Sequence, residues 1–411
     1  MRRLLHFGLL LGFLLSGTFT HGQDFVFSKE RKYRYTVPFE LQDNLIIISL
    51  RVNNSSSLRF IVDSGVQSAI LMNIKLGQEL NLNFARKVKL RGLGRGEKLE
   101  AYQSTKNQVR VGELQGKNQM LFVLTKDIFH LSGKLGTDVQ GLIGYPLFEN
   151  FIVKLNYREG AMTFYDPEHY TSKIRNRSVR LPLEIEDTKA YVRAKVLQNE
   201  QDTIEVKLLV DCGASNAMWL NANSSEQLEL PEKRKAMFLG RGLNGDIQGH
   251  LGRVDGLLLG KYLLPKPIVA FPDSASAQEI FGVGERNGAL GGEILRRFTV
   301  IFDYPNKQLI LTPNRSFSDP FEYNMTGLEI VKPMAFLPYF EVSVVDADSP
   351  AARAGVQVGD QLVEVNNIRA KDLTMNKLSE LFQSQAGRTL RITVARNGKY
   401  LKKKLVLKRE I

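Results

Sequence analysis

The sequence predicts a mostly β protein in which one fold unit occurs twice and a different domain follows. Two observations support this prediction. Three landmarks recur in the same order at nearly one offset, and short apolar or alternating runs between turn residues fill both copies. Helical periodicity is sparse over the same residues. With 411 residues, the chain is long enough for two or three domains that each bury a core.

The repeat begins with an apolar strand that runs into Asp-x-Gly. Residues 58–65 are Leu-Arg-Phe-Ile-Val-Asp-Ser-Gly, and residues 206–213 are Val-Lys-Leu-Leu-Val-Asp-Cys-Gly, so the two aspartates are 148 residues apart. Glycine-rich stretches at 92–96 and 240–245 follow at the same offset. In the third landmark, residues beginning at Gly141 align with those beginning at Gly288. Three matches in one order indicate two copies of one fold unit.

Each copy is expected to consist of strands bounded by turn signals. The expected strands are 44–52, 58–62, 119–124, 151–155, 191–197, 205–210, 254–259 and 299–302. Short helices are expected at 146–150 and 293–297. The copies span 32–167 and 179–313, with a polar link at 166–178 between them and a second polar break at 314–326.

The first 22 residues have the pattern of a signal peptide. Arg2 and Arg3 precede an apolar run from Leu4 to Leu15, and residues 16–22 are small and polar. The run is short for a membrane span, so no stable span is expected, although an uncleaved N-terminal anchor stays open. The single cysteine excludes an intramolecular disulfide. Together these features predict an exported protein of a bacterial envelope, periplasmic or secreted.

The formal net charge is +13. A basic surface favours anionic lipids or polymers, but the charges are scattered along the chain, so we expect an ordinary solvated surface. No basic stripe is interleaved with aromatic residues, and nucleic acid is therefore not an expected partner.

Cofactor and metal motifs lack their required context. Residues 240–245 fit Gly-x-Gly-x-x-Gly, but the residues that follow are poor helix formers, so no dinucleotide is expected. His130, His169 and His250 show no ligand spacing with cysteine or acids, and no metal site is predicted. Cys212 has no histidine linked to it by a motif, and we expect an inert buried thiol.

The paired motif resembles that of retropepsin-like and pepsin-like aspartic proteases, in which each half carries Asp-Thr/Ser-Gly and later two hydrophobic residues and a glycine. The first half supplies Asp63-Ser64-Gly65 and Leu142-Ile143-Gly144, and the second supplies Asp211-Cys212-Gly213 and Ala289-Leu290-Gly291. The resemblance covers residues 32–313. It implies two β-barrel lobes with one cleft between them and the two aspartates at its floor.

The resemblance assigns a role to each of these residues. Asp63 and Asp211 would share one proton, activate a water and cleave a peptide bond. Two carboxylates a few ångströms apart cannot both ionise cheaply, so one of them keeps a proton. Ser64, Gly65, Cys212 and Gly213 would support this dyad. The glycines Gly92, Gly94, Gly240 and Gly242 fall where family members carry flaps that cover the substrate. Cys212 replaces the family's hydroxyl and is a weaker hydrogen-bonding group, which favours the alternative of an inactive peptide-binding scaffold.

The C-terminal pattern is similar to PDZ domains of bacterial envelope proteases. Ser349-Pro350-Ala351 begins a turn that ends at Gly355, and Gly359-Asp360 precedes an apolar strand. The resemblance covers residues 326–409 and implies binding of protein or peptide ligands, including a free C-terminus, by strand addition. The groove candidates are Tyr339, Phe340 and Leu378. A PDZ domain that only packs against the protease lobes is the alternative.

Overall fold

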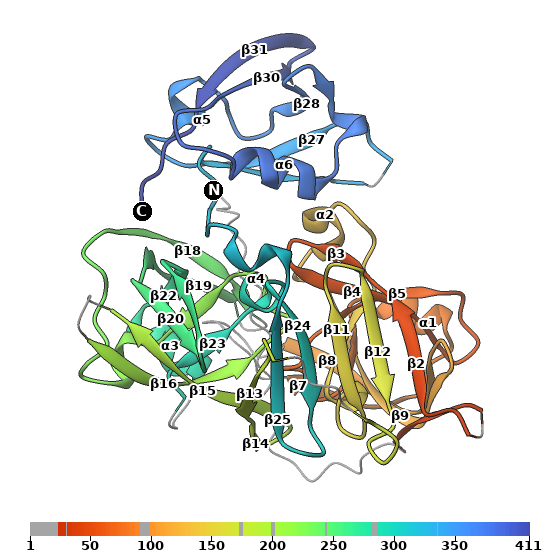
Figure 1. Ribbon diagram of the computed structural model, residues 1–411. Coiled ribbons are helices and arrows are strands. Elements are labelled where there is room, and N and C mark those ends of the chain that lie inside the picture. The colour runs from red at the N-terminus through yellow and green to blue at the C-terminus, as the bar shows by residue number, and fades with distance from the viewer. Residues whose placement is uncertain are drawn as a thin grey trace. The chain divides into compact units, whose positions relative to one another are not determined.

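The computed structural model describes residues 24–29, 31–90, 99–171, 176–198, 202–242, 245–281, 286–334 and 336–411 (Figure 1). These residues form two compact units. One holds both repeats, as residues 24–128 and Val139–Asp319, and the other holds Phe129–Asp138 with Pro320–Ile411. The expected signal peptide at 1–22 lies outside the described residues.

The first repeat folds around one sheet. Its strands are β1 (Phe25–Phe27), β3 (Glu40–Gln42), β4 (Leu45–Val52), β5 (Leu58–Val62), β6 (Ala69–Leu71), β7 (Phe84–Leu90), β8 (Leu99–Val111), β9 (Leu114–Leu124) and β10 (Gly141–Ile143), with helix α1 (Ile74–Glu79). β10 lies between β5, to which it is parallel, and β6, to which it is antiparallel. A Cβ atom at Gly141 would lie 2.2 Å from the carbonyl oxygen of Ile70, so this central position requires glycine.

The second repeat has the same arrangement in its own sheet. Its strands are β14 (Glu184–Glu186), β15 (Lys189–Leu197), β16 (Thr203–Val210), β17 (Met218–Leu220), β18 (Arg234–Gly242), β19 (Gly245–Arg253), β20 (Gly256–Leu259), β21 (Tyr262–Pro265), β22 (Ile268–Pro272) and β23 (Gly288–Leu290), with helix α3 (Ser274–Phe281). β23 is parallel to β16 and antiparallel to β17, as β10 is to β5 and β6. Gly288 repeats the close approach of Gly141, because its Cβ atom would lie 2.0 Å from the carbonyl oxygen of Trp219.

A third sheet joins the two repeats. It contains β2 (Arg34–Pro38), β11 (Ile152–Asn156), β12 (Ala161–Tyr165), β13 (Val179–Pro182), β24 (Phe298–Asp303) and β25 (Gln308–Pro313), in the order β13-β25-β24-β11-β12-β2. β11 and β24 are equivalent strands of the two repeats, and they pair with each other, Ile152 opposite Asp303 and Asn156 opposite Thr299. The two repeats are therefore related by an approximate two-fold axis through this pair.

The strands expected from the sequence are present in the structure with ends shifted by a few residues, and the mostly β fold class is confirmed. The expected helix at 146–150 is a single 3₁₀ turn, η1 (Tyr145–Leu147), with Pro146 in its first turn. The expected helix at 293–297 is α4 (Gly292–Leu295). The remaining 3₁₀ turns are η2 (Ala222–Ser224), η3 (Arg315–Ser318) and η4 (Ala370–Asp372). Among the described residues, no helix is long and apolar enough to cross a membrane.

The other unit consists of a small sheet and short helices. Its elements are β26 (Leu328–Val331), β27 (Phe340–Val345), α5 (Pro350–Arg353), β28 (Gln361–Val365), β29 (Ile368–Arg369), α6 (Met375–Phe382), β30 (Thr389–Arg396) and β31 (Lys399–Val406) (Figure 1). The Ser349 and Thr374 side chains cap α5 and α6 as N-cap residues. Helix α2 (Leu131–Leu135) also belongs here, since the Lys332 backbone N–H donates to the Gly133 carbonyl at 2.7 Å.

Candidate active site

Two aspartates lie where equivalent strands end. Asp63 follows β5 and Asp211 follows β16, and both side chains are fully buried. Their backbone N–H groups donate to the carbonyls of Ile143 and Leu290, each at 2.9 Å, which fixes each aspartate loop to the central strand beside it. The hydrophobic-hydrophobic-Gly segments therefore pack behind the aspartate loops. At Gly144 a Cβ atom would lie 1.9 Å from the Asp63 carbonyl oxygen.

The two carboxylates are held in the same way. The Gly65 N–H donates to Asp63 Oδ1 at 2.8 Å, and the Gly213 N–H donates to Asp211 Oδ1 at 2.9 Å. Both Oδ2 atoms are buried, and neither accepts a hydrogen bond from a described residue outside the pair. A Cβ atom at Gly213 would lie 2.2 Å from Asp63 Cγ, so the second loop contacts the first carboxylate directly. Each aspartate thus has one buried oxygen that its own loop does not engage.

Ser64 and Cys212 tie the two loops together by reciprocal hydrogen bonds. Ser64 Oγ donates to the Val210 carbonyl at 2.8 Å and accepts from the Cys212 N–H at 3.0 Å. Cys212 Sγ lies 3.4 Å from the Val62 carbonyl, to which it donates, and accepts from the Ser64 N–H at 3.3 Å. Burial raises the pKa of the Cys212 thiol to about 12, so it stays a neutral donor. The thiol therefore occupies the place of the expected hydroxyl with longer bonds.

Burial raises the pKa of both aspartates. For Asp63, the negative charge of Asp211 raises the pKa further, while the Gly65 N–H and the Lys189 ammonium lower it. For Asp211, the Gly213 N–H and the Arg286 guanidinium oppose the effect of burial on the pKa. Two carboxylates in one buried site cannot both ionise cheaply, so the pair retains a proton at pH values where an exposed aspartate has lost it.

Lys189 and Arg286 belong to no motif of the sequence, although both are more than nine-tenths buried beside this pair. Lys189 begins β15, two residues before Tyr191, which pairs with Leu209, two residues before Asp211. The Arg286 Nε donates to the Gly288 carbonyl at 2.9 Å. In the first repeat the hairpin position equivalent to Lys189 holds Leu45, so the repeat could not reveal this cation.

The described part of the glycine-rich segments lies at a hairpin. Gly240 and Gly242 belong to β18, which pairs with β19 up to Gly242 opposite Gly245. Gly92 and Gly94 lie outside the described residues, between β7 and β8, which pair antiparallel with Leu90 opposite Leu99. A role of these hairpins as flaps stays a prediction.

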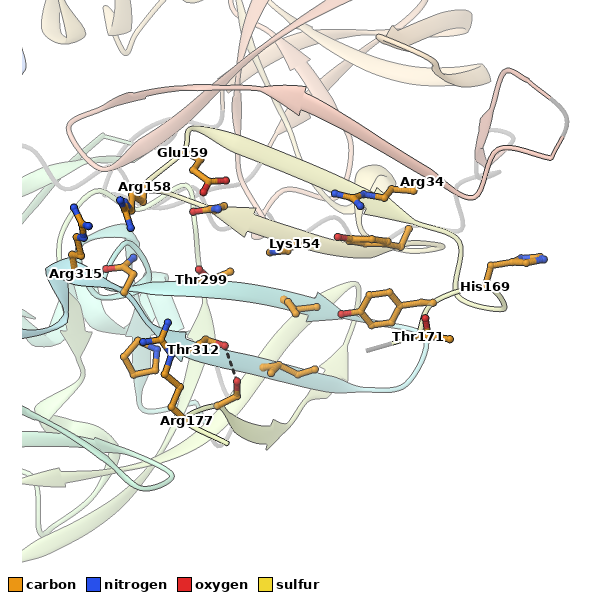
Figure 2. Close-up of a pocket in the computed structure, with 18 of the residues that line it drawn as sticks. Arg34, Lys154, Arg158, Glu159, His169, Thr171, Arg177, Thr299, Thr312 and Arg315 are labelled. Atoms are coloured by element: carbon orange, nitrogen blue, oxygen red, sulfur yellow. Dashed lines mark hydrogen bonds between the residues drawn. The ribbon is translucent and has the colours of Figure 1, made fainter. Parts of the chain in front are cut away.

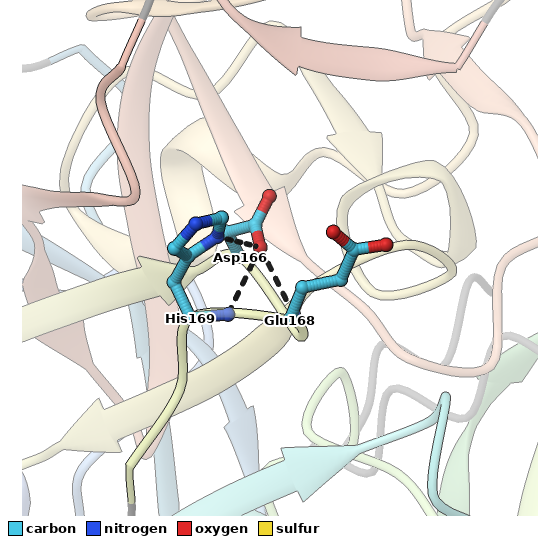
Figure 3. Close-up of side chains that lie close together, drawn as sticks. All are labelled: Asp166, Glu168 and His169. Carbon is cyan, nitrogen blue, oxygen red and sulfur yellow. Dashed lines mark hydrogen bonds and ion pairs between the residues drawn. The ribbon is translucent and has the colours of Figure 1, made fainter.

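One group of side chains has the composition of a metal site. Ligand atoms of Asp166, Glu168 and His169 lie within 4.8 Å of one another (Figure 3). Asp166 Oδ1, however, accepts the backbone N–H groups of Glu168 and His169 and lies 2.9 Å from His169 Nδ1. The His169 ring also stacks on Tyr33 with centroids 3.5 Å apart. These contacts describe a turn closed by an aspartate side chain, and we assign the group a structural role.

The groove candidates of the C-terminal unit differ in exposure. Phe340 and Leu378 are buried in the core of this unit, whereas Tyr339 is half-buried. The sheet order β26-β27-β28-β30-β31 makes β26 an edge strand, and Gly327, with φ +71°, precedes it. The same order makes β31 the other edge strand, so a peptide strand could add at β26 or at β31. The roles of Tyr339, Phe340 and Leu378 in peptide binding stay predictions.

Comparison with known proteins identifies two domains. The aspartyl protease family model matches residues 48–147, and the PDZ domain family model matches residues 341–396. The aspartic proteinase from Irpex lacteus aligns over 70% of this chain and 99% of its own, at 14% identity and a TM-score of 0.44, a likeness too distant to support any argument about activity. No match was found among curated proteins. The chain therefore contains an aspartyl protease domain and a PDZ domain.

Proposed function

We propose that this protein is an aspartic endopeptidase whose PDZ domain recognises protein or peptide ligands. The observation that carries the proposal is the symmetric arrangement of Asp63 and Asp211. Each is buried at a strand end, each accepts a glycine N–H at Oδ1, and each has a buried Oδ2 without a partner among the described residues. Two oxygens so placed can share one proton and polarise one water.

The chemistry follows from the shared proton. In the singly protonated pair, the ionised carboxylate takes a proton from the attacking water, and the protonated carboxyl donates to the substrate carbonyl oxygen. The peptide carbon thereby becomes tetrahedral, and the C–N bond breaks once the nitrogen is protonated. Burial favours the singly protonated pair over the doubly ionised one. Because the proton belongs to the pair, neither aspartate is assigned as the acid.

The test is cleavage of an unbiased peptide library by the mature chain across roughly pH 3–8, a span set by ordinary carboxylate and neutral values. Cleavage that depends on both aspartates supports the proposal, and the cut sites define specificity. Absence of cleavage at every pH supports an inactive peptide-binding scaffold. Export to the envelope, which residues 1–22 predict, is proposed on the sequence alone and is tested by fractionating cells that express the full chain.

Replacing Lys189 with methionine is expected to move both limbs of the pH–activity profile upward by about one pH unit. The ammonium stabilises ionised carboxylates, so it lowers the pKa of Asp63 and Asp211, and its removal raises both steps of the pair. Burial and the neighbouring Arg286 lower the pKa of Lys189 to about 8, so it is charged across the acidic and neutral range. The measurement is kcat/KM against pH for one cleaved peptide.

Lys207 supplies the matched control. Its side chain has as little exposed area as that of Lys189 and lies on the neighbouring strand β16. It pairs with the partly exposed Glu184 and Glu186 at 2.9 and 2.5 Å. Lys207→Met should lower stability and leave both limbs in place. Equal shifts in the two variants would show that general loss of charge, and not the position of Lys189, sets the profile.

Replacing Cys212 tests the link between the loops. Cys212→Thr provides a hydroxyl, which donates and accepts more strongly than the thiol, and is expected to retain activity within about threefold. Cys212→Ala leaves the buried Ser64 N–H without its acceptor and is expected to lower the free energy of unfolding by about 1 kcal/mol, the low end for a neutral bond. Denaturant titration and peptide cleavage measure the two effects. A threonine variant far more active than the wild type would favour the inactive-scaffold alternative.

A further inference from the structure

A concave site with a volume of about 910 Å³ lies on the six-stranded sheet (Figure 2). Its lining includes Lys154 and Asn156 of β11, Thr299 of β24 and Thr312 of β25. These strands come from both repeats, so the site exists only because the repeats share this sheet. The volume is much larger than a single phosphate or sulfate ion requires.

The charges in this site are predominantly positive. The lining includes five cationic side chains and one carboxylate, namely Arg34, Lys154, Arg158, Arg177, Arg315 and Glu159. None of these six forms an ion pair with another residue in the part of the chain that the structure describes. Arg34 lies over the Tyr165 ring, 5.3 Å from its centroid. Cations that line one hollow repel one another, and an anion placed among them relieves that repulsion.

Three of the arginines gather at one end of the site. Figure 2 shows Arg158, Arg177 and Arg315 there, from the β11–β12 turn, the segment before β13 and the segment after β25, with Glu159 of the same turn next to Arg158. The hydroxyls of Ser178 and Thr312 also line the site and lie 2.8 Å from each other. These basic residues are far apart in the sequence, and the fold brings them to one site. Guanidinium groups bind phosphate and sulfate through two parallel hydrogen bonds, and hydroxyls add further donors.

We propose that this site binds a ligand that carries two or more phosphate or sulfate groups, with Arg158, Arg177 and Arg315 as its main contacts. Lys154 and Arg34 also line the site, so a ligand with several anionic groups can contact them together with the arginine end. A soluble polyanion and a lipid headgroup present the same chemistry. Binding here requires neither Asp63 nor Asp211 and is independent of the proposed peptidase activity.

The experiment measures binding of inorganic tripolyphosphate to the full chain by calorimetry at about 0.15 M ionic strength. The expected result is saturable binding of one molecule per chain. The triple variant R158A/R177A/R315A is expected to bind at least about tenfold more weakly, because three charge-assisted contacts are lost.

The matched control is R51A/R369A/R391A, which removes the same charge from three exposed arginines that do not line the site. Binding within about twofold of the wild type is expected for this variant, because salt screens distant charges. Thermal unfolding of both triple variants confirms that they fold.

A second arm separates the two sources of the ligand. Vesicles containing phosphatidylglycerol are sedimented with each variant. If the wild type associates with the vesicles, and R158A/R177A/R315A does not while the control variant does, the ligand is a lipid headgroup. If tripolyphosphate binds but the vesicles do not, the ligand is a soluble polyanion. Absence of saturable binding to both probes, or an equal loss in the two triple variants, overturns the proposal.

Discussion

Peptide cleavage is expected to fall by at least about a thousandfold in Asp63→Asn and equally in Asp211→Asn. Asparagine matches aspartate in shape, and its Oδ1 can still accept the Gly65 or Gly213 N–H, so the loops should keep their geometry. The amide can neither take a proton from water nor share one with the other carboxylate. If the two aspartates act as one unit, as proposed, the double variant should be no less active than either single variant.

The measurement is kcat/KM on one cleaved peptide, with thermal unfolding beside it. Neither variant should be less stable than the wild type, because each removes a carboxylate that burial disfavours. Asp303→Asn is the matched control, since Asp303 is also buried but accepts hydrogen bonds from Asn306 and Gln308. It should lose stability and keep its activity. Cleavage that survives in Asp63→Asn or Asp211→Asn would sink the assignment.

The largest expected effect on stability is that of Gly144→Ala, which should lower the free energy of unfolding by about 3 kcal/mol or more. Its Cβ atom would lie 1.9 Å from the Asp63 carbonyl oxygen and 2.5 Å from that of Val66. Both contacts are with backbone, which cannot rotate away, so the aspartate loop must shift. Loss of cleavage should therefore accompany the loss of stability.

Gly256→Ala is the control in the same unit. Its Cβ atom would approach the Leu263 side chain at 2.7 Å, and Leu263 is nearly half exposed and can change rotamer. Denaturant titration of the two variants compares them directly. Equal stability of Gly144→Ala and Gly256→Ala would mean that Gly144 does not support the aspartate loop in the way that the structure indicates.

Much of the fold could be predicted because the repeat carries long-range information. Two similar sequence segments 148 residues apart predict equivalent places in the two repeats. The structure accordingly brings Asp63 and Asp211 into one buried site. Strand ends were predictable to within a few residues where apolar runs met turn residues, as at β5 and β24. Such apolar runs are typical of strands that are buried in a sheet.

What could not be predicted depends on contacts without a repeat partner. Lys189 occupies a position where the first repeat holds Leu45, and no local pattern distinguishes a lysine facing a buried carboxylate from one facing water. The five cations of the sheet site are spread from Arg34 to Arg315, so only the strand order brings them together. The position of β26 at the sheet edge likewise depends on which strands pair with each other, and the local sequence does not show this.

The pairing of β11 with β24 has a mechanical consequence. Each repeat contributes half of the six-stranded sheet, and five residue pairs join the halves. The two repeats therefore cannot hinge apart at this sheet without breaking the main-chain hydrogen bonds between β11 and β24. A fragment ending before residue 179 would leave β11 with an open edge. Because β11 and β24 are equivalent, a second copy of that fragment could fill that edge, so single-repeat fragments are expected to self-associate.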